Sequence, residues 1–281
     1  RVYTNAWMKL PVGKARYGLM LREDGIVMDD GTTTRISENH YHMTTTTAQA
    51  ANVLSHLEYY LQIVWPELNV NVVSTTEQWA GAAIAGPKSR DMLSKLYPDL
   101  DVSNDALPFM GYKEAEFFGV PSRIFRISFS GELAYEINVK SDHGMFMWEK
   151  MMEVGKEFGN QPYGTEALST LRIEMGHVAG PELDGRTIPS DVSLNGLVSK
   201  KKDFIGKNSL GREAFNVESR QKIVGLIPID RKSSIPEGSH IVQDQNAKLP
   251  NPKLGHVSSS CWSVENNNPF SLAIMKDGKN M

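Results

Sequence analysis

The fold is decided around residues 19–31, which read LMLREDGIVMDDG and place four carboxylates and two glycines between apolar segments. The pattern predicts one strand leading in over 17–21 and another leading out over 32–36. An Asp-Gly pair between extended segments is typical of a hairpin, so we expect Asp29-Asp30-Gly31 at a turn. If Asp29 and Asp30 face a pocket there, they form a site for a cationic or proton-donating substrate. If they face water, the segment is only a polar hairpin, which is the commoner case.

The composition is that of an ordinary globular protein, with 281 residues, 40% of them hydrophobic and 22% charged. The formal net charge of -3 shows no basic excess, so nucleic-acid binding is not expected. The single cysteine, Cys261, excludes an intrachain disulfide and a Cys-based zinc site, and it fits a cytoplasmic location. No apolar run approaches the ~20 residues of a membrane span, and residues 1–8 lack the layout of a signal peptide.

The distribution of patterns predicts an α+β fold of antiparallel sheets and packed helices. Apolar spacing predicts helices over 47–64, 87–97, 142–158 and 164–176, and alternation predicts strands over 70–74, 78–85, 113–119 and 123–139. In the third helix, Met145, Trp148, Met151 and Met152 are expected to fill the core. We expect an α+β domain over residues 1–215 and a small β-barrel-like domain over residues 221–281. The interior-like opening and the pattern near residue 281 lead us to expect truncation at both ends.

The segment SGELAYEINV at 130–139 predicts a strand with two unlike faces. One face carries Leu133, Tyr135, Ile137 and Val139, and the other carries Glu132, Ala134, Glu136 and Asn138. The second face suits either solvent or a ligand beside small Ala134. A carboxylate such as Glu136 can accept two parallel N–H bonds from a flat guanidine-like edge, which pterins have.

Arg172 borders the apolar stripe of the predicted helix 164–176. An arginine at this place needs a partner, because an unpaired buried charge is costly. We favour an internal salt bridge to Asp184 or Glu182, and a ligand anion or carbonyl is the alternative.

No metal site is predicted. His40 and His42 would share a strand face, but no third ligand lies nearby in the sequence, so a structural or surface role is expected. The chain contains no GxGxxG fingerprint, Walker A loop, GxSxG elbow or HExxH motif.

Five segments in fixed order resemble the aminomethyltransferase family, whose type member is the glycine cleavage T-protein. They are residues 25–30, AGP at 85–87, SGE at 130–132 with YEI at 135–137, LRIEMG at 171–176, and DFIGK at 203–207. The resemblance covers nearly the whole chain. Within the family, RYGLMLREDG at 16–25, HMTTTT at 42–47 and TEQWA at 76–80 most resemble the folate-binding C-terminal region of the sarcosine oxidase alpha subunit.

This resemblance implies a tetrahydrofolate site. It implies that Asp30 is the catalytic carboxylate near the reactive folate nitrogens, and that Asp29, Tyr135, Glu136 and Arg172 bind the folate or the substrate, with Glu136 on the pteridine edge. It further implies that the oxidised N-methyl group of sarcosine, as an iminium or formaldehyde, is taken up to form 5,10-methylenetetrahydrofolate. Flavin and NAD would lie only on missing regions or on other sarcosine oxidase subunits.

Two alternatives are left open. One is a stand-alone T-protein aminomethyltransferase or a related folate-dependent demethylase. The other is a non-catalytic folate-binding module, like relatives that assist iron–sulfur maturation and share a KGCxGQE stretch. The corresponding residues 202–207 read KDFIGK without a cysteine, which counts against the module.

Overall fold

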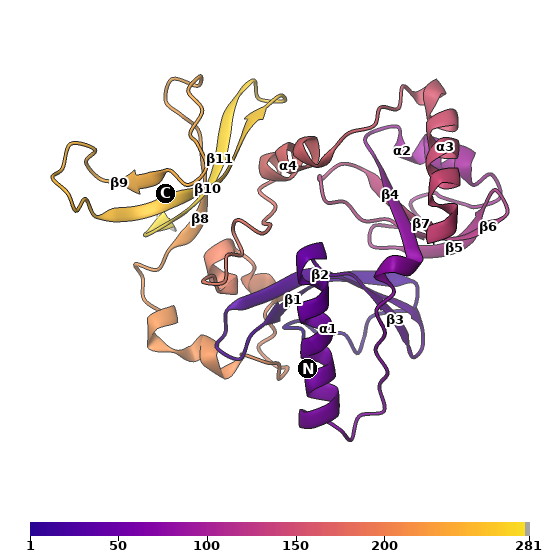
Figure 1. Ribbon diagram of the computed structural model, residues 1–281, viewed down its shortest axis with the longest axis horizontal. Coiled ribbons are helices and arrows are strands. Elements are labelled where there is room, and N and C mark those ends of the chain that lie inside the picture. The colour runs from indigo at the N-terminus through magenta and orange to yellow at the C-terminus, as the bar shows by residue number, and fades with distance from the viewer. Residues whose placement is uncertain (279–281) are drawn as a thin grey trace. The chain divides into compact units, whose positions relative to one another are not determined.

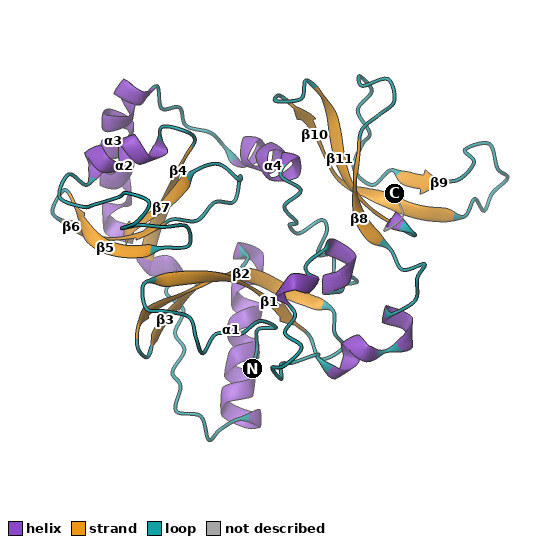
Figure 2. Cartoon of the chain, turned by 180° about the vertical axis from the view of Figure 1, so that it is seen from behind, coloured by secondary structure: helices purple, strands orange, loops and turns teal. Residues whose placement is uncertain are grey.

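The computed structural model describes residues 1–278 and has the predicted α+β class (Figures 1 and 2). Within that range the strands form three sheets, in the orders β1-β2-β3, β4-β7-β6-β5 and β8-β11-β10-β9. The α-helices are α1 (Ala50–Tyr59), α2 (Ser89–Leu96), α3 (Gly144–Gly155) and α4 (Thr165–Glu174). The strands are β1 (Lys14–Leu21), β2 (Val27–Ser37), β3 (His40–Met43), β4 (Trp79–Ala85), β5 (Tyr112–Phe117), β6 (Val120–Phe125), β7 (Ala134–Lys140), β8 (Lys222–Leu226), β9 (His240–Val242), β10 (Lys253–Ser263) and β11 (Asn268–Met275).

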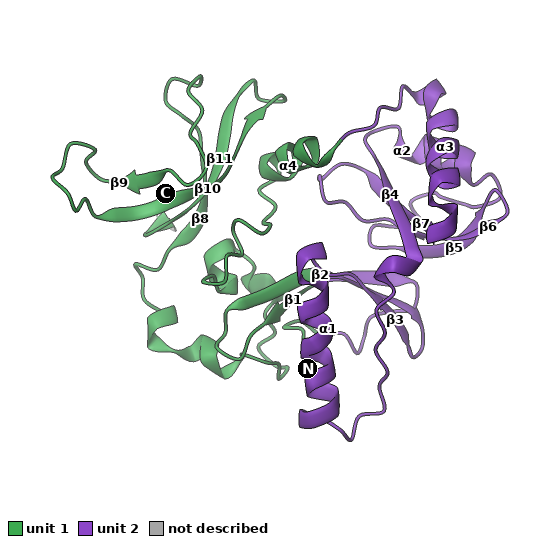
Figure 3. Ribbon diagram, viewed as in Figure 1, with its two compact units in different colours: residues 1–6, 18–30, 164–281 green, residues 7–17, 31–163 purple. Residues whose placement is uncertain are grey.

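The chain divides into two compact units (Figure 3). Unit 1 comprises Arg1–Ala6, Gly18–Asp30 and Gly164–Met281, and unit 2 comprises Trp7–Tyr17 and Gly31–Tyr163. Each unit therefore gathers separate stretches of sequence. The division into domains over 1–215 and 221–281 stays a prediction.

Unit 2 is built on the sheet β4-β7-β6-β5, one face of which carries its main core. Alternation along β7 sends Tyr135, Ile137 and Val139 to this face, and all three are fully buried. Helices α2 and α3 cover it with Leu93, Leu96, Met147 and Met151. The expected Met stripe was half wrong: Met151 is buried, but Met145 and Trp148 are 70% and 45% exposed. The buried face of α3 is formed by Met147, Met151 and Gly155, which are spaced four residues apart.

The predicted turn at Asp29-Asp30-Gly31 is wrong. These residues lie inside β2, and the turn between β1 and β2 uses the earlier pair Asp24-Gly25 instead. Gly25 has φ +89°, and an Asp24 carboxylate oxygen accepts the Ile26 N–H at 3.0 Å. Gly31 allows the backbone of β2 to lie close to Thr44 and does not form a turn. A Cβ added at Gly31 would lie 2.1 Å from the Thr44 carbonyl oxygen.

Unit 1 contains the C-terminal sheet β8-β11-β10-β9, in which every paired strand is antiparallel. Strand β11 begins at Asn268 and ends at Met275. Ile274 of this sheet packs with Val178 and Val192. Closure of the sheet into a barrel stays a prediction.

Two further outcomes concern the surface. The strand expected over 70–74 is not formed, and Val70 and Val73 are 52% and 75% exposed. Among residues 1–278, no helix combines the length and apolar character needed to cross a bilayer.

Candidate functional site

In unit 2, Glu136 lies on the face of the β4-β7-β6-β5 sheet opposite the main core. Its register partners are Ala83 on β4 and Phe125 on β6. The carboxylate is half-buried, and among the described residues no side chain forms a hydrogen bond or ion pair with it. Burial raises the pKa of Glu136. A half-buried carboxylate without a protein donor is a suitable acceptor for an N–H-bearing ligand.

The surroundings of Glu136 combine small and aromatic residues. Ala83 is exposed, so little side-chain volume covers the carboxylate on the β4 side. On the same face the Arg123 guanidinium lies 4.0 Å from the centre of the Trp79 ring, and its Nε atom is 3.7 Å from Glu114. The face therefore presents flat aromatic and guanidinium surfaces near an acceptor, an arrangement that suits a planar polar ligand.

Tyr135, the neighbour of Glu136, lies on the other face of β7. It is fully buried in the core, with the Arg90 guanidinium 5.7 Å from its ring centre. Its hydroxyl group has no hydrogen-bond partner in the described part of the chain. The strand thus separates Tyr135 from the Glu136 face, and its expected contact with a ligand stays a prediction.

In unit 1, Asp29 and Asp30 are successive residues of β2, so their side chains leave opposite faces of the strand. Asp29 is 3% exposed, whereas Asp30 is half-buried. The two carboxylates therefore do not form a pair on one face, and Asp30 is the one that solvent or a ligand can reach. His177 is within the electrostatic reach of Asp30.

Arg172 on α4 forms the salt bridge that the sequence favoured, and its partner is Glu182. Nη1 donates to Glu182 Oε2 at 2.7 Å, and both side chains are buried. Nη1 also contacts the His177 carbonyl oxygen at 3.3 Å, and Nη2 donates to Ser259 Oγ at 2.6 Å. The salt bridge is confirmed, and a direct ligand contact of Arg172 stays a prediction.

His177 adjoins this salt bridge at the end of α4, and its N–H donates to the Arg172 carbonyl oxygen at 2.9 Å. Burial lowers the pKa of His177, the Arg172 guanidinium adds to that change, and the Asp30 and Glu182 carboxylates oppose it. Sequence reasoning missed His177, because no motif marks it.

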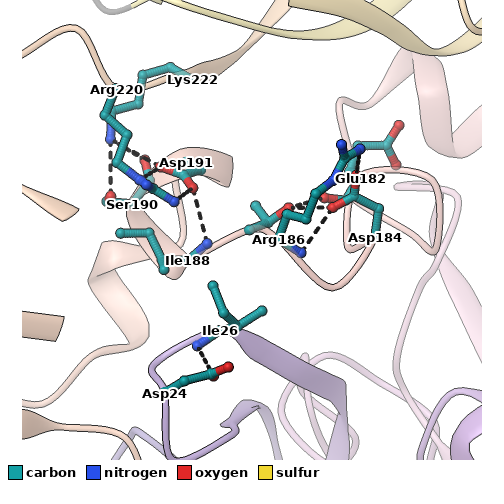
Figure 4. A network of polar contacts seen from close by, with 11 residues as sticks. Asp24, Ile26, Glu182, Asp184, Arg186, Ile188, Ser190, Asp191, Arg220 and Lys222 are labelled. Atoms are coloured by element: carbon teal, nitrogen blue, oxygen red, sulfur yellow. Dashed lines mark hydrogen bonds and ion pairs between the residues drawn. The ribbon is translucent and has the colours of Figure 1, made fainter. Parts of the chain in front are cut away.

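A second buried ion network in unit 1 was also missed (Figure 4). Asp191 is fully buried and accepts from Arg220 at 2.6 and 2.7 Å and from the Ile188 N–H at 3.0 Å. Lys222 lies 3.8 Å from Asp191 and donates to the Ser190 carbonyl oxygen at 2.9 Å. This network fixes the start of β8 to the turn at 188–192, and only a long-range fold could reveal it. In the part of the chain that the structure describes, no group of His, Cys, Asp or Glu could hold a metal ion.

Comparison with known families decides the classification. Residues 1–202 match the GCVT N-terminal domain family. The chain belongs to the aminomethyltransferase (GCVT) family. It is 31% identical over 275 residues to the aminomethyltransferase of Chloroherpeton thalassium, covering 97% of this chain and 72% of that protein.

Higher identity is found with parts of longer proteins. The chain is 48% identical to the sarcosine oxidase subunit alpha of Rhizobium meliloti and 46% identical to that of Corynebacterium sp. strain P-1. These matches cover 100% and 99% of the chain, but the chain spans only 29% of the length of each relative.

The fold also matches a solved family member. The crystal structure of glycine cleavage system aminomethyltransferase T from Bartonella henselae aligns with a TM-score of 0.80, 22% identity, and coverage of 98% of this chain and 71% of that one. At this identity the likeness shows the fold.

Proposed function

We propose that this chain is the tetrahydrofolate-dependent one-carbon transfer part of a sarcosine oxidase alpha subunit. It takes the oxidised N-methyl group of sarcosine, as an iminium or formaldehyde, and yields 5,10-methylenetetrahydrofolate, with release of glycine from the iminium or of water from formaldehyde. The 48% identity to a subunit of that name supports the assignment to the oxidase. Flavin and NAD would belong to other regions or subunits of the complex.

The observation that carries this proposal is the Glu136 carboxylate on the face of β7 opposite the main core. It is half-buried and has no protein donor among residues 1–278, so its burial is costly unless a ligand donates to it. The pteridine edge offers two parallel N–H groups, which match the two oxygens of a carboxylate. The residues of this face therefore fit the ligand that the family resemblance implies.

Asp30 is the proton acceptor in this proposal. Bound tetrahydrofolate supplies the amine nucleophile. As that amine attacks the electrophilic carbon it loses its N–H proton, and Asp30 is the carboxylate of unit 1 assigned to receive it. A positioned base of this kind contributes ~10²–10⁴-fold to the rate. Asp29 is buried on the other face of β2, and Arg172 is held by Glu182. Both would support the site rather than react.

The test is calorimetric titration of the full-length polypeptide with tetrahydrofolate. Glu136→Gln should weaken binding by about 10–100-fold, the loss expected when a charged hydrogen-bond acceptor becomes neutral. Glu132→Gln, an exposed carboxylate in the same segment, is the matched control and should bind like the wild type. Tyr135→Phe asks separately whether the buried hydroxyl matters to the ligand. Absence of binding by the wild-type protein would remove the proposal.

A second candidate is aminomethyl transfer from a carrier protein, as in a glycine cleavage system. The similarity to the Chloroherpeton thalassium aminomethyltransferase, of which the chain covers 72%, supports this second candidate. The two candidates separate by substrate. Folate-dependent turnover of sarcosine supports the oxidase, whereas turnover only with an aminomethyl-loaded lipoyl carrier supports the second candidate.

A further inference from the structure

Strand β10 contains an irregularity at the point where it meets the Arg172–Glu182 salt bridge. Its register with β11 runs from Val257 opposite Ala273 to Ser259 opposite Leu272, so Ser258 is an extra, bulged residue. In a regular strand two successive side chains would point to opposite faces. Here both Ser258 and Ser259 donate to the same oxygen, Oε1 of Glu182, at 2.7 and 2.6 Å. The bulge therefore aims two neighbouring hydroxyl groups at one carboxylate.

These contacts complete a buried network around Glu182. Its Oε2 accepts from the Arg172 guanidinium at 2.7 Å and from the Ala179 N–H at 3.0 Å. Ser259 Oγ in turn accepts from Arg172 Nη2. Glu182 and Ser259 are fully buried, and Arg172 is 3% exposed. Four donors on one carboxylate and two fixed nitrogens on one guanidinium leave this part of unit 1 little freedom to rearrange.

The network ends on His177. Arg172 Nη1 donates to the backbone carbonyl oxygen of His177, and the backbone N–H of His177 donates to the backbone carbonyl oxygen of Arg172. The charged groups acting on His177 come from β2 through Asp30, from α4 through Arg172, and from the following loop through Glu182. The bulge, the salt bridge and the backbone of His177 are thus joined by consecutive hydrogen bonds.

We infer that Ser258 and Ser259 are positioning residues, which hold the Arg172–Glu182 salt bridge and, through it, the backbone of His177 in place by means of the bulge in β10. The C-terminal sheet then takes part in the one-carbon transfer although neither serine touches a substrate. This inference rests on the proposed function for its catalytic consequence, but its structural part does not. Nothing in the motifs of the sequence marks either serine.

The structural part is tested by hydrogen exchange in the full-length polypeptide. The double variant Ser258→Ala/Ser259→Ala should speed exchange of the amides in residues 172–183 by at least about ten-fold, because Glu182, which accepts from the Ala179 N–H and from Arg172, loses two of its four donors and is no longer held in place. Ser260→Ala, which removes only the contact with Ser271, is the control on the same strand and should leave this region unchanged. Unchanged exchange at residues 19–21, which are fully buried in unit 1, shows that the unit carrying the two serines is folded. Unaltered protection of 172–183 in the double variant overturns the inference.

The catalytic part is tested by steady-state kinetics on the same variants. Misplacing Arg172, which supports the proposed site, should lower kcat roughly 10–100-fold. The KM for tetrahydrofolate should change by less than about three-fold, because the Glu136 contact is untouched. Ser259→Thr keeps the hydroxyl and should recover kcat. Equal losses in kcat for Ser259→Ala and Ser259→Thr contradict the inference. A wild-type protein without folate dependence refutes the proposed function instead, and the exchange result still decides whether the bulge holds Arg172.

Discussion

Replacing Glu182 by glutamine should destabilise the protein strongly without changing the size of the side chain. The carboxylate is fully buried and accepts from Arg172, the Ala179 N–H, Ser258 and Ser259. The amide loses the negative charge and turns one acceptor into a donor. Arg172, with 4% of its side chain exposed, is then left as a buried cation without its counter-charge.

The expected cost follows from this geometry. Removing one partner of a buried ion pair typically costs ~3–5 kcal/mol, because the remaining charge stays desolvated. Removing both charges relieves that penalty. The double variant Arg172→Met/Glu182→Gln should therefore lose at least about 2 kcal/mol less than the sum of the two single losses, which lies within the range for directly contacting residues.

Urea denaturation followed by circular dichroism measures these free energies of unfolding. The matched control is Glu157→Gln, which breaks the Lys95–Glu157 pair at 3.2 Å, where both side chains are more than half exposed. That loss should stay below about 0.5 kcal/mol, as for surface pairs generally. A Glu182→Gln loss as small as the control's, or strict additivity in the double variant, would refute the reasoning.

Three further predictions concern single residues. Gly31→Ala should cost ~1–3 kcal/mol, because the new Cβ meets the Thr44 carbonyl oxygen at 2.1 Å, whereas Gly196→Ala, with nothing within 4 Å, should be neutral in the same thermal denaturation. Glu136→Gln should stabilise the protein at pH 7: burial raises the pKa of this carboxyl above 4.5, so its ionisation costs stability above that pH, and the gain should vanish at lower pH. Burial lowers the pKa of His42 from 6.5 to about 4. Between pH 6.5 and about 4 the unfolded chain therefore binds a proton at His42 that the folded protein does not, and the folded protein loses stability as the pH falls. His42→Gln should therefore retain more stability than the wild type at pH 5, and identical pH profiles would contradict the burial of His42.

Local pattern predicted much of the fold, and its failures have physical causes. The helix over 164–176 and the two unlike faces of β7 followed from spacing alone, because burial of one face dictates where apolar residues recur. The chain offers two Asp-Gly pairs, Asp24-Gly25 and Asp30-Gly31, and turn propensity does not distinguish them. The turn forms at Asp24-Gly25, because β2 continues through Asp30-Gly31 as a strand and pairs with β3 further along.

The sequence by itself determined the α+β class, the family, the position of Glu136 opposite the core face of β7, and the need of Arg172 for a partner. These rest on periodicity, ordered motifs and the cost of a buried charge, all of which are local or pairwise. Only the tertiary structure decided which carboxylate meets Arg172, that Asp29 and Asp30 face apart, and that a bulge in β10 brings Ser258 and Ser259 to Glu182. Those contacts join residues up to 87 positions apart, and no local preference encodes them. They form because packing leaves each buried polar group a single place where its hydrogen bonds can be satisfied.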